Sequence, residues 1–165
     1  MTSDELRGHV RGAAIGNFIA NAIINGALAW WLLGDHATLL VWGDPAYGPD
    51  LIVTGFLLSA IVTAIVIWTH RRKARRGDLT AAPLGSPVLE DASRRGVWGN
   101  CLLVGVVGAV ASGLLVVASA GFVGSLSAPA YVGLKALWTG VLAAAIVEPA
   151  MRLGLHLGAI ERAAA

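Results

Sequence analysis

The chain has 165 residues, of which 56% are hydrophobic and only 13% are charged, and its mean hydropathy is +0.72. A soluble domain carries about a quarter charged residues, and a fold of this length has too little interior to bury so many apolar side chains. These values exclude an ordinary soluble domain and predict that most of the chain lies in lipid. The net charge of +2 and the single cysteine, Cys101, predict neither a nucleic-acid partner nor an intrachain disulfide.

Four continuous apolar segments are long enough to cross the roughly 30 Å hydrocarbon core of a membrane as helices. They cover about 12–33, 51–69, 98–121 and 130–150. Strands of a membrane barrel would alternate apolar and polar residues over about ten positions, and these segments do not. The sequence therefore predicts an all-α integral membrane protein, with residues 1–165 forming a single domain that folds as a four-helix transmembrane bundle.

The basic residues that flank the apolar segments indicate how the chain is oriented. Four spans return the chain to its starting side, and the flanking Arg and Lys residues precede the first and third segments and follow the second and fourth. The two opposite loops, 34–50 and 122–129, contain no Lys or Arg. Because cytoplasmic loops carry an excess of these residues, we expect insertion into the cell membrane with both termini in the cytoplasm (N-in/C-in).

The cytoplasmic loop predicted over 70–97 begins with a dense basic cluster. Pro83, Gly85 and Pro87 follow the cluster and disfavour a helix, so we expect a flexible polar connector. Basic clusters next to a membrane attract anionic lipid headgroups. We therefore expect anionic lipid at the side chains Arg71, Arg72, Lys73, Arg75 and Arg76.

Weak internal similarity favours two repeated helical hairpins. The pair Arg11-Gly12 reappears 84 positions later as Arg95-Gly96, and Thr54-Gly55 reappears 85 positions later as Thr139-Gly140. Two hairpins of the same orientation would be related by a pseudo-two-fold axis along the membrane normal.

A stripe of asparagines marks one face of the first segment. Asn17, Asn21 and Asn25 are spaced by four residues, which places them on one side of a helix, and Asn100 occupies the corresponding start of the third segment. An unpaired amide in hydrocarbon costs several kcal/mol, so the stripe must face other helices, another subunit or a wet cavity. Two interpretations remain open: hydrogen bonds that join helices, or a polar path for a substrate or ion.

Two charged residues lie in or near the fourth segment. Lys135, near its start, is either anchored by a carboxylate or attracts an anionic substrate. The nearest candidates for that carboxylate are Asp35, Asp44 and Asp50. Glu148 lies near the inner end, four residues before Arg152, and forms either a helical ion pair or a titrating group at an inner gate. Both residues are included in the predicted path.

Small residues at four-residue spacing predict close helix contacts, within the chain or between copies, because they let backbones approach each other. They form three stripes, in the first, third and fourth segments: Gly12 and Gly16; Gly105, Ala109 and Gly113; Ala136, Gly140 and Ala144.

The sequence contains no motif typical of a metal centre, a catalytic set or a phosphate loop, so we predict no cofactor, no metal and no catalytic residues. The leading hypothesis is a small channel or permease subunit with an asparagine-lined path, acting as a homo-oligomer or beside a membrane partner subunit. One alternative is a non-catalytic accessory or scaffold subunit of a membrane complex. The other is an intramembrane enzyme acting on a lipid or prenyl substrate.

Overall fold

The computed structural model describes residues 3–80, 84 and 86–164. Its helices are α1 (Ser3–Leu33), α2 (Tyr47–Arg76), α3 (Pro87–Phe122) and α4 (Ala128–Ala163), and all four are long and apolar enough to cross a membrane. Two short strands, β1 (Thr38–Leu40) and β2 (Ser125–Ser127), pair antiparallel with Leu39 opposite Leu126. The sequence predicted the helices but not this pair of strands.

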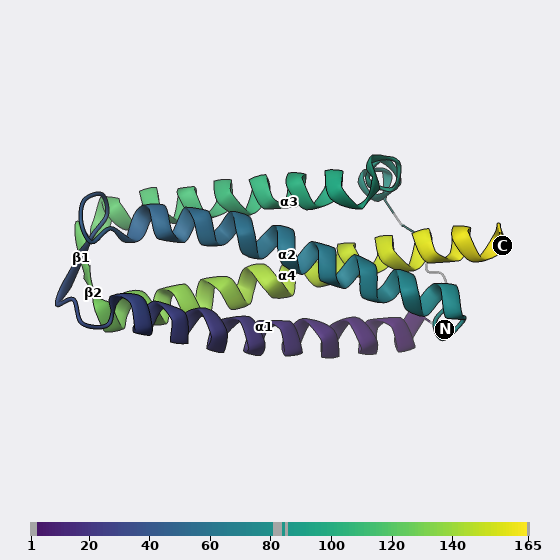
Figure 1. Cartoon of the computed structure of the whole chain (residues 1–165), viewed down its shortest axis with the longest axis horizontal. Helices are drawn as coiled ribbons and strands as arrows, with labels where there is room; N and C mark the ends of the chain where they lie inside the picture. Colours follow the sequence, from purple (N-terminus) through teal and green to yellow (C-terminus); the bar gives the residue numbers. More distant parts are fainter. Residues whose placement is uncertain (1–2, 81–83, 85, 165) are drawn as a thin grey trace.

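The helices lie in a row, in the order α1, α4, α2, α3, rather than around a common axis (Figure 1). The central helices α2 and α4 cross, α1 packs along α4, α3 packs along α2, and α3 meets α4 only briefly. The expected bundle is therefore an open layer, because α1 and α3 each pack mainly against one neighbour. Within this pattern α1 packs on α4 as α3 packs on α2. The first hairpin (α1, α2) and the second (α3, α4) therefore have equivalent neighbours, as two repeated hairpins would require.

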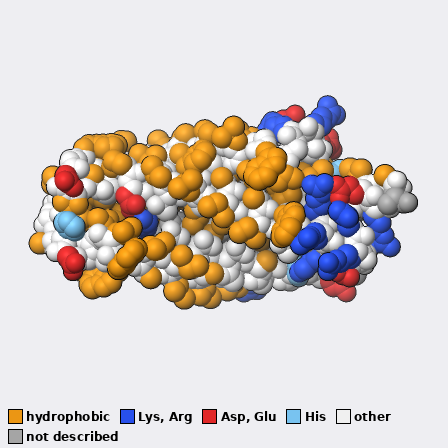
Figure 2. Space-filling view, viewed as in Figure 1, with side chains coloured by type: hydrophobic (Ala, Val, Ile, Leu, Met, Phe, Trp, Pro, Cys, Tyr) orange, Lys and Arg blue, Asp and Glu red, His pale blue; other side chains and the backbone are white. Residues whose placement is uncertain are grey.

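The two ends of the layer differ in charge. Both termini lie at one end, where Lys and Arg side chains gather, and we call it the basic end (Figures 1 and 2). The β1–β2 pair lies at the opposite end, which we call the strand end. Hydrophobic side chains cover the face between them in Figure 2, and large apolar residues such as Ile23, Val110 and Leu114 are exposed. An apolar belt of this extent is compatible with a membrane protein.

The connector predicted over 70–97 is largely helical, contrary to expectation. Helix α2 continues through the basic cluster to Arg76 and ends at Gly77, whose φ of 83° is the left-handed conformation of a helix C-cap. Helix α3 begins at Pro87, because proline has no N–H to lose at the first turn of a helix. The remaining connector positions 81–83 and 85, which include Pro83 and Gly85, lie outside the described residues.

The predicted small-residue stripes have different surroundings. Those of α3 and α4 pack within the chain: Gly105 lies against Phe56, Gly140 against Phe18 and Ala136 beside Gly26, while Ala109, Gly113 and Ala144 are partly buried. Gly12 and Gly16 are exposed instead, and a Cβ atom on either would meet no atom within 4 Å. The stripe of α1 therefore makes no close contact with the described part of the chain.

Helices α2 and α3 approach closely at a pair of glycines, Gly55 and Gly108, that do not belong to the predicted stripes. A Cβ on Gly55 would lie 2.8 Å from the carbonyl oxygen of Gly108, and a Cβ on Gly108 would lie 2.5 Å from that of Gly55. The fully buried side chains of Ser59 and Ser112 lie beside these glycines. Backbones this close gain van der Waals contact that lipid cannot replace.

The two serines are expected to respond differently to replacement by alanine. Ser112 Oγ accepts a hydrogen bond from Trp138 Nε1 at 2.9 Å, whereas Ser59 Oγ is buried without a partner. Ser112→Ala should lower the free energy of unfolding by about 1–2 kcal/mol because it leaves the indole N–H unpaired, and Ser59→Ala should leave it unchanged or raise it. Thermal unfolding of both variants in the same detergent checks this. Equal losses would contradict it.

Candidate functional site

Gly96 divides α3 into a short helix over 87–95, which we call the lid, and a long helix that follows it. Gly96 has φ 71° and ψ 174°, a backbone conformation that is essentially restricted to glycine. The lid therefore turns away from the axis of the long helix, and Figure 1 shows it end-on. At the start of the lid, the hydroxyl of Ser86 accepts a hydrogen bond from Leu89 N at 3.3 Å.

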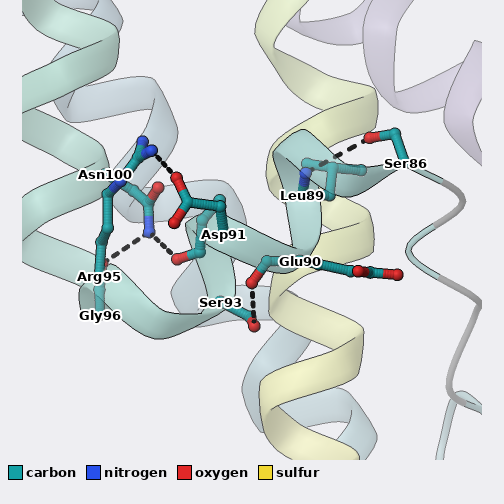
Figure 3. Close-up of polar contacts among 9 residues, drawn as sticks. Ser86, Leu89, Glu90, Asp91, Ser93, Arg95, Gly96 and Asn100 are labelled. Carbon is teal, nitrogen blue, oxygen red and sulfur yellow. Dashed lines mark hydrogen bonds and ion pairs between the residues drawn. The ribbon is translucent and has the colours of Figure 1, made fainter.

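Asn100 holds the lid against the long helix (Figure 3). Its amide nitrogen donates to the carbonyl oxygens of Ala92 and Gly96, each at 2.7 Å. Ala92 lies in the last turn of the lid and Gly96 is the kink residue, so the two bonds join the lid to the long helix across the kink. Asn100 is 4% exposed, and both hydrogens of its amide are bonded to the backbone. The sequence predicted that this side chain lines a polar path.

A groove of about 330 Å³ lies between α2, α3 and α4, in the half of the layer nearer the basic end. Its walls come from 59–67 of α2, from 88–111 of α3 with the lid included, and from 142–153 of α4. The groove exists because α3 stays away from α4. Most of the lining residues are Val, Leu, Ile and Ala, and the polar ones are Ser59, Thr63, Arg95 and Asn100. Arg95 is paired with Asp91 of the lid.

A second pocket of about 560 Å³ continues the groove at the basic end, and we call it the mouth pocket. Val88, Leu89 and Pro149 line both spaces. The mouth pocket is also lined by Leu84, Ser86, Glu148 and Arg152. Arg152 Nη2 lies 2.8 Å from Glu148 Oε1, which is the helical ion pair that the four-residue spacing indicated.

The asparagine stripe is partly buried on α1 and does not line the groove. The amide nitrogens of Asn17, Asn21 and Asn25 each donate to the carbonyl four residues earlier, at 2.9, 2.9 and 3.0 Å. One hydrogen of each amide is thus satisfied inside α1. Between α1 and α4, Thr139 Oγ1 lies 3.3 Å from the carbonyl oxygen of Asn21, and it lies closer, at 2.8 Å, to the carbonyl oxygen of Lys135 in its own helix.

A charged cluster lies between α2 and α4 in the half nearer the strand end. Lys135 is 3% exposed, and its Nζ lies 2.6 Å from Asp50 Oδ2. Asp50 is therefore the partner among the three carboxylates considered. The hydroxyl of Tyr131 donates to the same carboxylate oxygen, and the ring centroids of Tyr131 and Tyr47 are 5.7 Å apart. Asp50 also lies in the first turn of α2, where a negative charge is favourable.

Sequence reasoning missed the tyrosines, although a signal for them was present. Pro45-Ala46-Tyr47 is repeated as Pro129-Ala130-Tyr131, 84 positions later (131 − 47), and Asp50 and Lys135 are 85 positions apart (135 − 50). These offsets match those of the other repeated pairs. Positions related by these offsets therefore meet between α2 and α4, one pair as tilted tyrosine rings and the other as opposite charges.

The basic cluster at the end of α2 is partly neutralised by α4. Arg71 pairs with Glu161, and Arg75 Nε lies 3.8 Å from Glu161 Oε2. The hydrogen bond from Arg71 lowers the pKa of the Glu161 carboxyl below its ordinary value, at a position beyond the apolar spans. The guanidinium carbon of Arg72 lies 3.9 Å from the ring centroid of Trp68, a cation–π contact.

Within the described ranges, no group of three or more His, Cys, Asp or Glu side chains could hold a metal ion. Comparisons of the chain with family models, with curated proteins and with solved structures gave no match. The groove, the mouth pocket and the charged clusters are therefore the features that bear on function.

Proposed function

We propose that this chain is a lipid-binding integral membrane protein whose groove accommodates one hydrocarbon chain of a lipid from the cytoplasmic leaflet. The observation that carries the proposal is the apolar groove between α2, α3 and α4. The protein would lie in the cell membrane with both termini and the basic end in the cytoplasm. The charge distribution supports this orientation, because Lys and Arg gather at that end and are retained on the cytoplasmic side (Figure 2).

The length of the groove fits one leaflet of a bilayer. On α3 the walls run from Asn100 to Ala111, and on α4 from Leu142 to Leu153. Eleven helical steps of about 1.5 Å in each case give about 16 Å. Half of the roughly 30 Å hydrocarbon core is about 15 Å. An occupant that extends from the lid to the middle of the membrane therefore matches the chain region of one leaflet.

The size and chemistry of the groove also fit a hydrocarbon chain. Sites for small molecules have volumes of about 300–1,000 Å³ and are mostly apolar with a few polar groups, which matches a groove of about 330 Å³. An aqueous solute would leave its polar groups unpaired against these walls. A lipid chain has no polar groups to desolvate on entering from the membrane, and it gains contacts with packed side chains.

The test is retention of lipid after purification. We expect native mass spectrometry to detect one bound phospholipid per chain, and a phospholipid with a photoactivatable group near the end of its chain to label buried residues at the deep end of the groove, such as Ser59 and Gly108. Ala111→Trp fills the groove and should remove both signals. Ala118→Trp is the matched control, since Ala118 is exposed on α3 two turns further on and does not line the groove.

A second pair of variants guards against misfolding at Ala111. Ala145 lines the groove on α4, and Val141, one turn earlier, is exposed and does not line it. Ala145→Trp should remove the bound lipid and Val141→Trp should not. Retention of lipid by both groove variants, with unfolding temperatures like those of their controls, would refute the proposal.

The asparagine-lined channel or permease stays a prediction with less support. The amides of Asn17, Asn21 and Asn25 each already donate one hydrogen to a carbonyl of α1, so a solute moving along the stripe would meet amides that are partly satisfied. Flux through reconstituted vesicles that is lost in the Asn21→Leu, Asn25→Leu double variant would favour the path over the groove.

A further inference from the structure

We propose that the lipid bound in the groove carries a zwitterionic headgroup with a phosphate and a primary ammonium, and that Arg152 and Glu148 bind these two groups in the mouth pocket. This inference rests on the proposed function and adds the class of lipid. It follows from the continuity of the two spaces, since Val88, Leu89 and Pro149 line both the groove and the mouth pocket. A chain in the groove therefore places its headgroup beside the Glu148–Arg152 pair.

The charges of the mouth pocket match a headgroup with both signs. The guanidinium of Arg152 can bind a phosphate through two N–H groups, and the carboxylate of Glu148 can accept hydrogen bonds from an ammonium. A purely anionic headgroup would meet one attractive and one repulsive charge. A quaternary ammonium has no hydrogen to donate to Glu148. The pair therefore favours phosphoethanolamine chemistry over glycerol phosphate or phosphocholine.

The Glu148–Arg152 ion pair can be opened at little cost. The two side chains are 52% and 25% exposed, and ion pairs at such exposure contribute little to stability. A phosphate would then pair with Arg152 and an ammonium with Glu148.

The experiment measures lipid retention by native mass spectrometry for phosphatidylethanolamine, phosphatidylglycerol and phosphatidylcholine with identical chains. The unmodified protein should retain phosphatidylethanolamine about tenfold more strongly than the other two, as expected for one charge-assisted hydrogen bond. Glu148→Gln should abolish this preference. Arg152→Gln should weaken retention of all three lipids, because each has a phosphate.

The matched control is Glu161, a carboxylate that also pairs with an arginine, Arg71, but lines neither the groove nor the mouth pocket. Glu161→Gln should keep the preference for phosphatidylethanolamine. Equal retention of the three lipids, or stronger retention of phosphatidylglycerol, overturns the headgroup assignment. Loss of the preference in Glu161→Gln also overturns it. In each of these cases, loss of bound lipid in Ala111→Trp still supports lipid binding in the groove. Retention of lipid by Ala111→Trp would instead count against the proposed function.

Discussion

Replacing Asp50 with leucine is expected to destabilise the protein by about 3–5 kcal/mol, because it leaves the buried ammonium of Lys135 without a counter-charge. The side chain of Lys135 is 4% exposed, so water cannot take over the role of the carboxylate. Tyr131 also loses the acceptor of its hydroxyl hydrogen. The expected result is a large fall in the thermal unfolding midpoint in detergent, with less monodisperse protein on size exclusion.

The converse variant and the double variant separate charge from packing. Lys135→Leu should cost less, since the side chain of Asp50 is 31% exposed and its carboxylate can still be solvated. The Asp50→Leu, Lys135→Leu double variant should recover much of the lost stability, because replacing both charges of a buried pair by apolar groups is often nearly neutral. If the double variant is as unstable as Asp50→Leu, the loss comes from packing or from Tyr131, and the charge argument fails.

The sequence was sufficient for the helices because their signal is local. Each span is a continuous apolar run, and a segment in lipid must form its backbone hydrogen bonds internally.

The effect of Pro87 was predicted wrongly for a physical reason. The same missing N–H that breaks a helix interior is harmless at its first residue, and only the position of Ser86 as N-cap distinguishes the two cases.

The site was less predictable because it depends on how helices pair. The asparagine stripe has the correct periodicity for one face, but a side-chain amide can bond its own helix, as the bonds from Asn17 to Ala13 and from Asn21 to Asn17 do. The groove arises from the turn at Gly96 and from the separation of α3 and α4. The sequence does not show that Gly96 adopts a positive φ. The residue pattern of α3 likewise does not show that α4 will stay away from it.

Adding a methyl group at the α2–α3 contact is the second substitution with a large expected effect. Gly55→Ala and Gly108→Ala should each lower the free energy of unfolding by about 1–3 kcal/mol, because each new Cβ would press on a backbone carbonyl that can move only if the helices separate. Gly12→Ala and Gly16→Ala are matched controls. Their Cβ atoms would enter open space, so replacing glycine inside a helix should raise stability by about 0.5–1 kcal/mol.

The same four variants, followed by thermal unfolding and by size exclusion in detergent, also examine the predicted self-association. If α1 faces lipid, Gly12→Ala and Gly16→Ala leave the elution volume unchanged while stability rises. If α1 docks on a second copy or a partner subunit, the added methyl groups reduce the association and the gain in stability disappears. Unchanged stability in Gly55→Ala and Gly108→Ala would contradict the close approach of α2 and α3, and the groove that this approach helps to shape would then have different walls.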